Sequence, residues 1–353
     1  ISFPTRTAKN HTNTKISPPH THRMVRSLTR HVISILVVTS LASISSIQSL
    51  QIGPLLSTCV DACHRGCLEI RTVQERRVQL GEGELNTLLK DGEDARSALT
   101  VADENAHKVI VGSLRKQWGD ALRIVGEEDE NTTPATIHDW IAQNELPPLR
   151  THLFENDLGE DTPEIEMSSV TLYIDPLDGT REFVEGRLEN CQVLVGIAIN
   201  NEPVAGAIGI PFPNGGLVDD DGEVVGPTVV HGIAEVGTGI LEGSTPLKRG
   251  PFPLEKHCDG ISYPRPHICT GDSTAPVMTA ATQALKQRYR GSNVIYGGAG
   301  NKILAAALGE VTVSLQHKVG GPWDLCAPTA VLLGFGGKIT DLFGEEISMY
   351  QSE

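Results

Sequence analysis

Two carboxylates stand three positions apart at the end of an apolar stretch, and this feature constrains the fold more than any other. Residues 170–174 (VTLYI) predict a buried strand, which runs directly into residues 175–180 (DPLDGT), where a proline turns the chain. With that turn, Asp175, Asp178 and the carbonyl of Leu177 can face one point, and hard cations such as Mg²⁺ bind oxygens arranged in this way. The plain alternative is a turn capped by one Asp, but the six-residue string is far more specific than a bare D-x-x-D.

A second acidic run also follows a predicted strand. Residues 126–129 (GEED) come directly after the apolar residues 121–125. Alone, such a run is a solvent-exposed acidic loop. Two strand ends at one edge of a sheet, however, can build a single pocket with several carboxylates. In the DPLDGT string, Gly179 and Thr180 begin a turn whose backbone amides can hold a phosphate.

Two further motifs contribute to the predicted site. Asp324 opens the predicted helix 323–333, where an Asp is most often an N-cap; one oxygen could cap while the other binds a metal. Residues 297–302 (GGAGNK) form a Gly-rich turn into a helix over 301–308. Their spacing is not that of a P-loop, but the turn can hold an anion or let a ligand approach the backbone. The histidines are scattered and show no spacing typical of a metal site or a catalytic group.

The hydrophobic pattern predicts strands and helices in alternation, hence a mixed α/β class. A helix over residues 54–77 places Cys59, Cys63 and Cys67 on one face, and we interpret that face as buried rather than as a metal or redox cluster. The pattern predicts further elements as follows: a helix over 101–117, a surface excursion with one short helix over 131–168, strands over 192–199 and 204–210 joined by a turn at Asn200-Asn201, a strand over 261–270, a helix over 274–288, and strands over 311–315 and 338–342.

Charge is unevenly distributed along the chain. The first acidic residue is Asp61, and residues 1–60 contain six Lys and Arg. Because the whole chain of 353 residues carries −15, residues 61–353 carry −21. Such an acidic surface argues against nucleic acid polymers as partners. Residues 1–53 predict a secretory or organelle targeting leader, or an over-extended reading of the gene, in which case the protein is cytoplasmic. The apolar run in it is short for a stable membrane span.

In their order, the strings GEE, DPLDGT and WD resemble the magnesium-dependent, lithium-sensitive phosphomonoesterase family of inositol monophosphatase. The resemblance runs from about Leu55 to the C-terminus. It is strongest to the 3′(2′),5′-bisphosphate nucleotidase branch, in IDPLDGTREFVEG, GGAGNK, WDLCAP and GGKITDLFG. It implies a layered α/β/α/β sandwich of two subdomains. Residues 54–212 would supply most metal ligands, and residues 213–353 would supply Asp324 and most substrate contacts.

The resemblance also implies a role for each matching residue. Two or three Mg²⁺ ions would be bound by four carboxylates and one carbonyl: Glu127, Asp175, Leu177, Asp178 and Asp324. Catalysis, by direct in-line attack of a metal-activated water without a phosphoenzyme, would use Asp94, Glu127 and Thr180. The substrate would be bound by Gly179, Thr180, Thr270, Gly298 and Lys302.

The chain departs from the family pattern in three places. Family members carry an Asp shortly before a T-x-A-D string, and it partners the catalytic Thr. Here that string lies in residues 97–103 (SALTVAD); Asp94 is the best match, about one residue out of register, and Asp91 is the alternative. Residues 271–273 lack the His that animal nucleotidases carry there. The chain ends at Glu353, earlier than most family members, which predicts a missing final strand or helix.

The substrate implied is a small phosphorylated nucleotide. Adenosine 3′,5′-bisphosphate would be hydrolysed to AMP and phosphate, which clears a by-product of sulfation, and 3′-phosphoadenylyl sulfate is a second candidate substrate. One alternative is an inositol polyphosphate 1-phosphatase, disfavoured by Gly179 and by the REFVEG flank. Another is a regulatory protein that binds phosphonucleotides without catalysis, suggested by the register of Asp94. The sequence does not predict an oligomeric state.

Overall fold

The computed structural model of the chain describes residues 49–80, 88–89, 98–129, 131–154, 164–249, 255–256, 262–263, 267–317 and 320–347. They all belong to one compact unit, residues 46–353. Most of the predicted leader lies outside the described residues, as do Asp91 and Asp94. The division into two subdomains at residue 212 stays a prediction.

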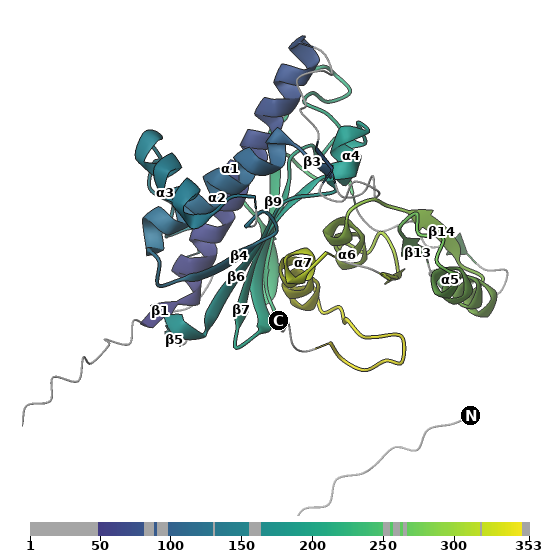
Figure 1. Cartoon of the computed structure of the whole chain (residues 1–353). Coiled ribbons are helices and arrows are strands. Elements are labelled where there is room, and N and C mark those ends of the chain that lie inside the picture. The colour runs from purple at the N-terminus through teal and green to yellow at the C-terminus, as the bar shows by residue number, and fades with distance from the viewer. Residues whose placement is uncertain are drawn as a thin grey trace, which may run out of the picture. The chain divides into compact units, whose positions relative to one another are not determined.

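A six-stranded sheet lies at the centre of this unit (Figure 1). Its strands follow the order β10-β9-β8-β7-β6-β4, in which β4 and β6 are parallel and all other neighbours are antiparallel. The bounds are β4 Arg123–Gly126, β6 Val170–Asp178, β7 Gln192–Ile199, β8 Glu202–Ile210, β9 Thr228–Ile233 and β10 Gly237–Ile240.

The hairpin predicted between residues 192 and 210 is present. Asn200 and Asn201 form its turn with φ of 52° and 68°, values that asparagine tolerates better than most residues. Strands β9 and β10, in contrast, lie in a Gly- and Pro-rich stretch that the sequence pattern left unassigned. They form because β9 pairs with β8 over six residues, a long-range contact that local composition does not reveal.

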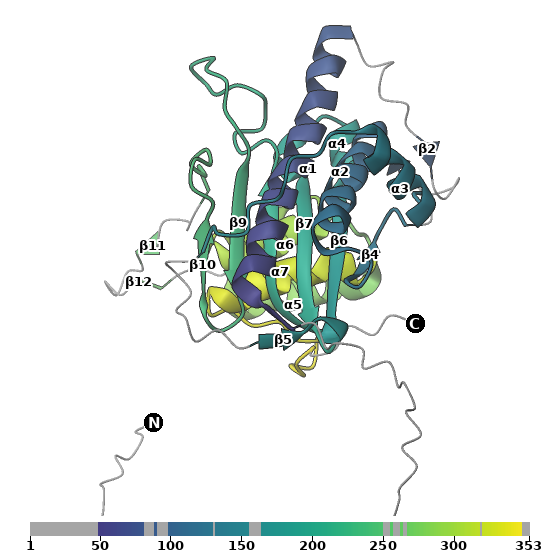
Figure 2. The ribbon, with the colours of Figure 1, turned by 90° about the vertical axis from the view of Figure 1, so that its left-hand side faces the viewer.

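Helices cover both faces of the six-stranded sheet (Figures 1 and 2). On one face lie α1 (Ile52–Leu80) and α2 (Val101–Trp118), and the Sγ of Cys63 on α1 donates to the carbonyl of Val193 on β7 at 3.5 Å. The three cysteines of α1 are fully buried, which confirms the interpretation of that helix face as part of the core. On the other face lie α6 (Ala299–Ala307) and α7 (Pro322–Gly334). Helix α7 approaches closely, because a Cβ on Gly206 of β8 would lie 2.7 Å from the Cα of Ala327.

A second, parallel sheet follows beyond α6, with strand order β14-β13-β15. Its strands are β13 His267–Thr270, β14 Ser292–Ile295 and β15 Val313–Ser314, and α5 (Pro276–Tyr289) packs against β13 and β14. The predicted α/β/α/β layering is therefore confirmed. The strand predicted over residues 338–342 is wrong: the structure has there only an isolated pairing of Thr340 with Glu346. Its apolar residue Leu342 is 62% exposed, so no core contact supports a strand.

The remaining elements are short. Helix α3 is the one short helix predicted in the excursion after residue 131, and α4 directly follows the DPLDG string. The bounds are α3 Pro134–Gln143, α4 Thr180–Val184, the 3₁₀ turns η2 Met167–Ser169 and η3 Leu188–Asn190, and the strands β1 Ser49–Gln51, β2 Leu88–Leu89, β3 Ala98–Leu99, β5 Glu164–Glu166, β11 Glu255–Lys256 and β12 Ser262–Tyr263.

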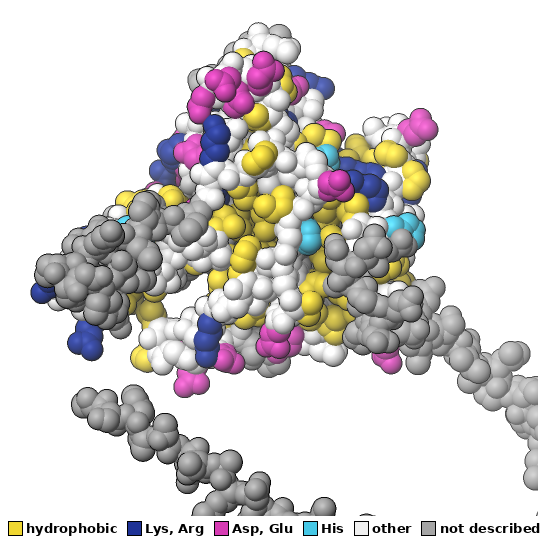
Figure 3. Space-filling model, turned by 180° about the vertical axis from the view of Figure 1, so that it is seen from behind, with side chains coloured by type: hydrophobic (Ala, Val, Ile, Leu, Met, Phe, Trp, Pro, Cys, Tyr) yellow, Lys and Arg dark blue, Asp and Glu magenta, His cyan; other side chains and the backbone are white. Residues whose placement is uncertain are grey.

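The surface reflects the acidic composition. Figure 3 shows one face on which Asp and Glu side chains gather toward the upper and lower ends, with hydrophobic side chains between them. Lys and Arg side chains form only small groups among the described residues of that face. None of the helices in the described part of the chain combines the length and the apolar composition that a membrane crossing requires.

Candidate active site

Three buried carboxylates from two distant parts of the chain meet at one point. Asp175 and Asp178 come from the end of β6, and Asp324 comes from the first turn of α7. Each offers an oxygen within 4.8 Å of the others. They are only 1%, 6% and 8% exposed, so water screens their mutual repulsion poorly. Oxygen donors gathered in this way fit a hard divalent cation, which would neutralise the cluster.

Burial raises the pKa of all three carboxyl groups. For Asp324 it raises the pKa to about 7. For Asp175, burial is the largest cause of the raised pKa, followed by the negative charges of Glu127, Asp178 and Asp324. For Asp178, burial outweighs the Lys302 ammonium and the backbone amides, which act to lower its pKa. Without a cation these carboxyl groups therefore keep their protons to a higher pH than ordinary carboxyl groups do.

Glu127 reaches the same cluster from the neighbouring strand. Strands β4 and β6 are parallel, with Gly126 opposite Ile174, so their carboxyl ends meet at one edge of the sheet. The backbone N–H of Glu127 donates to the carbonyl of Ile174 at 3.0 Å, which ties the GEED turn to β6 one residue before Asp175. The Glu127 charge contributes to the raised pKa of Asp175, so the two carboxyl groups are close.

The Gly-rich turn at residues 297–302 binds the carboxylate of Asp178. The backbone amides of Ala299 and Gly300, at the start of α6, donate to its two oxygens at 2.8 and 2.7 Å. Gly298 has a φ of 72°, and a Cβ there would lie 2.8 Å from Asp178 Oδ2, so only glycine fits. Lys302 donates from Nζ to the Gly298 carbonyl and closes the turn.

The structure corrects the prediction that Asp324 caps α7. The N-cap is Gly321, followed by Pro322 at the first helical position, and Asp324 lies within the first turn. Proline is favoured at the first helical position because a backbone N–H there has no acceptor within the helix. The helix therefore begins before Asp324. The Asp324 carboxylate accepts instead from the backbone amide of Gly320, outside the helix. This contact orients the carboxylate toward the β6 carboxylates.

Thr180 lies between two acceptors at the edge of the cluster. Its Oγ1 is 3.0 Å from the carbonyl oxygen of Leu177 and 2.8 Å from Oδ1 of Asp103 on α2. The second oxygen of Asp103 accepts from the backbone N–H and the hydroxyl of Thr100, at 2.7 and 2.6 Å, in a capping box. Asp103 is fully buried, and burial raises its pKa to about 7.

Asp103 is the functional candidate that the sequence interpretation missed. Asp103 lies inside the string SALTVAD (residues 97–103), but the family resemblance predicts the upstream residue Asp94 as the partner of Thr180. The capping-box spacing from Thr100 to Asp103 predicts only that this carboxylate lies at the start of α2; its contact with Thr180 has no local signal in the sequence. Asp94 itself lies outside the described residues, so its role stays a prediction.

The other predicted substrate residues lie at the ends of α4 and β13. Gly179 is the left-handed N-cap of α4, with a φ of 89°, and directly precedes Thr180. Thr270 ends β13 and is 6% exposed. A Cβ on the next residue, Gly271, would lie 3.8 Å from Lys302 Nζ. The end of β13 and the start of α6 therefore lie side by side next to Asp178.

The chain is similar to known phosphatases over most of its length. The model of the inositol monophosphatase family matches residues 57–352. The 3′(2′),5′-bisphosphate nucleotidase 1 of Dictyostelium discoideum is 31% identical, over 85% of this chain and 88% of its own length. Inositol monophosphatase 3 of Xenopus laevis is 25% identical, over 85% of this chain and 75% of its own. The crystal structure of CysQ from Bacteroides thetaiotaomicron, a bacterial member of the inositol monophosphatase family, superposes with a TM-score of 0.52 at 18% identity, over 86% of this chain and 94% of that one.

Proposed function

This chain belongs to the inositol monophosphatase family, and on that premise we propose that it is a magnesium-dependent 3′(2′),5′-bisphosphate nucleotidase. Phosphatase activity follows from the family and its relatives. Magnesium dependence, lithium sensitivity, the nucleotide substrate and a role in sulfate assimilation are the proposal. The observation that carries it is the buried cluster of Asp175, Asp178 and Asp324 beside the Thr180–Asp103 hydrogen bond.

The carboxylate cluster fits two or three Mg²⁺ ions. Buried carboxyl groups whose pKa values are raised for want of a counter-charge are what a divalent cation would stabilise. The ions would be held by the following groups: Glu127, Asp175, Asp178, Asp324 and the carbonyl of Leu177. When bound, they would supply Lewis-acid stabilisation of the phosphate oxygens and lower the pKa of the attacking water.

Thr180 and Asp103 perform the proton transfer in this proposal. An ionised Asp103 accepts the hydrogen bond from Thr180 Oγ1, at 2.8 Å in the structure. That interaction leaves the lone pairs of Oγ1 free to accept a hydrogen bond from the attacking water. The proton lost by the water passes through Oγ1 to Asp103 as the water oxygen bonds to phosphorus. The P–O ester bond breaks at the same time, and the leaving oxygen takes a proton from solvent. A pKa of about 7 suits Asp103 to this exchange at neutral pH.

The substrate contacts proposed are Gly179, Thr180, Thr270, Gly298 and Lys302. Lys302 places a positive charge beside Asp178. This charge would attract the second phosphate of a bisphosphate substrate. The similarity to the Dictyostelium nucleotidase over 88% of that protein supports the nucleotide. The similarity to a Xenopus inositol monophosphatase, at 25% identity, supports an inositol phosphate as the second candidate substrate.

Phosphate release from two substrates tests the proposal. With Mg²⁺, we expect rapid release from adenosine 3′,5′-bisphosphate, inhibition of that release by Li⁺, and slow release from inositol 1,4-bisphosphate. Release from the inositol phosphate alone would keep the metal-assisted chemistry and overturn the substrate. Release from neither, with tight nucleotide binding, would favour a regulatory binding protein.

The raised carboxyl pKa values predict how pH affects the stability of the metal-free protein. An unfolded Asp has a pKa of about 3.9, whereas the folded value for Asp324 is about 7. The folded state therefore binds more protons between these values, and the stabilisation present below pH 4 is lost as pH rises through 7. We expect the Tm in EDTA to fall from pH 5 to pH 8. We expect Mg²⁺ to raise it most at pH 8, where it replaces the lost protons.

A matched variant separates this effect from general charge repulsion. Asp178→Asn removes one buried carboxyl group, so its Tm in EDTA should depend less on pH and should respond less to Mg²⁺. Thermal unfolding monitored by circular dichroism at four pH values measures both. A wild-type Tm that is constant from pH 5 to pH 8 and unaffected by Mg²⁺ would contradict the metal site.

A further inference from the structure

One face of α2 serves two parts of the candidate site. Asp103 begins the helix and contacts Thr180. His107 follows one turn later on the same face and, like Asp103, is fully buried. Whereas Asp103 faces α4, His107 faces the turn at residues 126–129, which carries Glu127. No sequence motif connects this histidine with the site.

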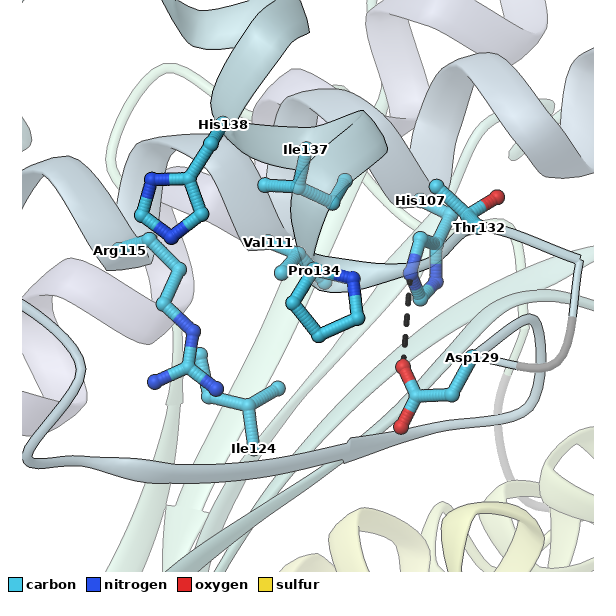
Figure 4. A pocket seen from close by; sticks show the side chains of 9 residues that line it. All are labelled: His107, Val111, Arg115, Ile124, Asp129, Thr132, Pro134, Ile137 and His138. Atoms are coloured by element: carbon cyan, nitrogen blue, oxygen red, sulfur yellow. Dashed lines mark ion pairs between the residues drawn. The ribbon is translucent and has the colours of Figure 1, made fainter.

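A chain of contacts runs from His107 to the backbone of that turn, and Figure 4 shows its first contact, the ion pair between His107 and Asp129. Nε2 of His107 lies 3.6 Å from Oδ1 of Asp129. The other carboxylate oxygen of Asp129 accepts from the backbone N–H of Gly126 at 2.8 Å. The imidazole also packs against Gly126 itself, since a Cβ there would lie 2.6 Å from Cε1 of His107. The ring therefore fixes the position of the turn both by contact and through Asp129.

Glu127 is the residue that this turn presents to the carboxylate cluster. On one side, Gly126 is held by Asp129 and by the imidazole. On the other, the N–H of Glu127 is bound to the carbonyl of Ile174 on β6. A Glu side chain is short, so the position of its backbone limits where its carboxylate can reach. Loss of the His107–Asp129 contact would let the turn shift and move that carboxylate away from Asp175.

We propose that His107 and Asp129 are positioning residues that hold the Gly126–Glu127 backbone, so that Glu127 can serve as a metal ligand. This inference rests on the proposed function, because it takes Glu127 as a ligand. If His107 and Asp129 act in this way, replacing either residue should lower the affinity for Mg²⁺ and leave the binding of the nucleotide unchanged. Residues that orient a ligand from behind typically alter metal affinity by 10- to 100-fold when replaced.

The pocket in Figure 4 also provides a matched control. His138 lines it from α3, has a side chain 58% exposed, and lies 3.6 Å from Asp120 rather than from the turn. In the full-length protein, His107→Ala and Asp129→Ala should each raise the dissociation constant for Mg²⁺ about tenfold, measured by calorimetry. The KM for adenosine 3′,5′-bisphosphate at saturating Mg²⁺ should stay within about twofold. His138→Ala should change neither quantity.

Conservative variants distinguish positioning from general stability. His107→Gln keeps a donor near the place of Nε2 and should recover most of the Mg²⁺ affinity. If His107→Ala fails to fold, Asp129→Ala still tests the inference, because the Asp129 side chain is 46% exposed and contributes little to the core. Unchanged Mg²⁺ affinity in Asp129→Ala would overturn it, as would equal losses in His107→Ala and His138→Ala. A wild-type protein that binds no Mg²⁺ would overturn the proposed function and this inference together. A protein that binds Mg²⁺ but cleaves another phosphomonoester would overturn the substrate alone.

Discussion

Replacing Asp178 by Asn is expected to lower the rate of phosphate release by about 1000-fold or more, since losing several kcal/mol of metal-derived stabilisation corresponds to that factor. Asp178 lies within 4.8 Å of the other two carboxylates of the cluster. The substitution removes the charge that a cation needs at this position. It also places an amide opposite the N–H donors of Ala299 and Gly300, where one of the two amide hydrogen bonds must be lost.

Metal binding and turnover should fail together in this variant. Calorimetry should show Mg²⁺ affinity lowered by about 100-fold, while the Tm in EDTA at pH 8 rises because one buried carboxyl group is gone. Asp220→Asn is the control, because Asp220 has a side chain 93% exposed and pairs with Lys248 on the surface. It should behave as the wild type. Full activity in Asp178→Asn would show that the carboxylate cluster is not the metal site.

Local patterns predicted the parts of this structure that depend on neighbouring residues. The hairpin turn at Asn200-Asn201 and the buried cysteine face of α1 follow from side-chain chemistry within a few positions. The edge where β4 and β6 end together was predicted because both strands run into acidic residues. The first two predictions each rest on one short stretch of sequence, and the third rests on the same local signal at the ends of two separate strands.

Contacts between distant residues account for what the sequence did not predict. Asp103 and Thr180 are 77 positions apart in the sequence, and no local pattern predicts that their oxygens lie within hydrogen-bond distance. The same holds for His107 and Asp129, which come from different elements. The Gly-rich turn at residues 297–302 was predicted to hold an anion or to let a ligand approach the backbone. Its amides instead bind Asp178, so the anion is a side chain of the protein itself.

Replacing Asp103 by Asn should lower kcat by a factor of about 100 to 10,000, the usual contribution of a positioned acid or base. The amide is nearly the same size as the carboxylate and can still accept from Thr180, but it cannot take a proton. The KM should change little, because Asp103 lies behind Thr180 and is fully buried. Steady-state kinetics at saturating Mg²⁺ separate the two constants.

The pH profile provides the readout that a merely structural role would not produce. Asp103 must be ionised to accept the proton, and its pKa is about 7. Wild-type kcat should therefore fall as pH decreases below about 7. The residual activity of Asp103→Asn should lack that limb. Thr180→Ser, which keeps the hydroxyl, should retain most activity, whereas Thr180→Val should lose it.

Asp94→Asn decides between the two candidate partners of Thr180. The resemblance pointed to Asp94, whereas the structure places Asp103 at 2.8 Å from the Thr180 hydroxyl. If Asp103 is the proton acceptor, Asp94→Asn removes no group that the reaction uses, so it should keep kcat within about threefold of the wild type and retain the acid limb. The reverse result, with the large loss in Asp94→Asn and normal activity in Asp103→Asn, would restrict Asp103 to capping α2. It would assign proton transfer to Asp94, the residue to which the family resemblance pointed.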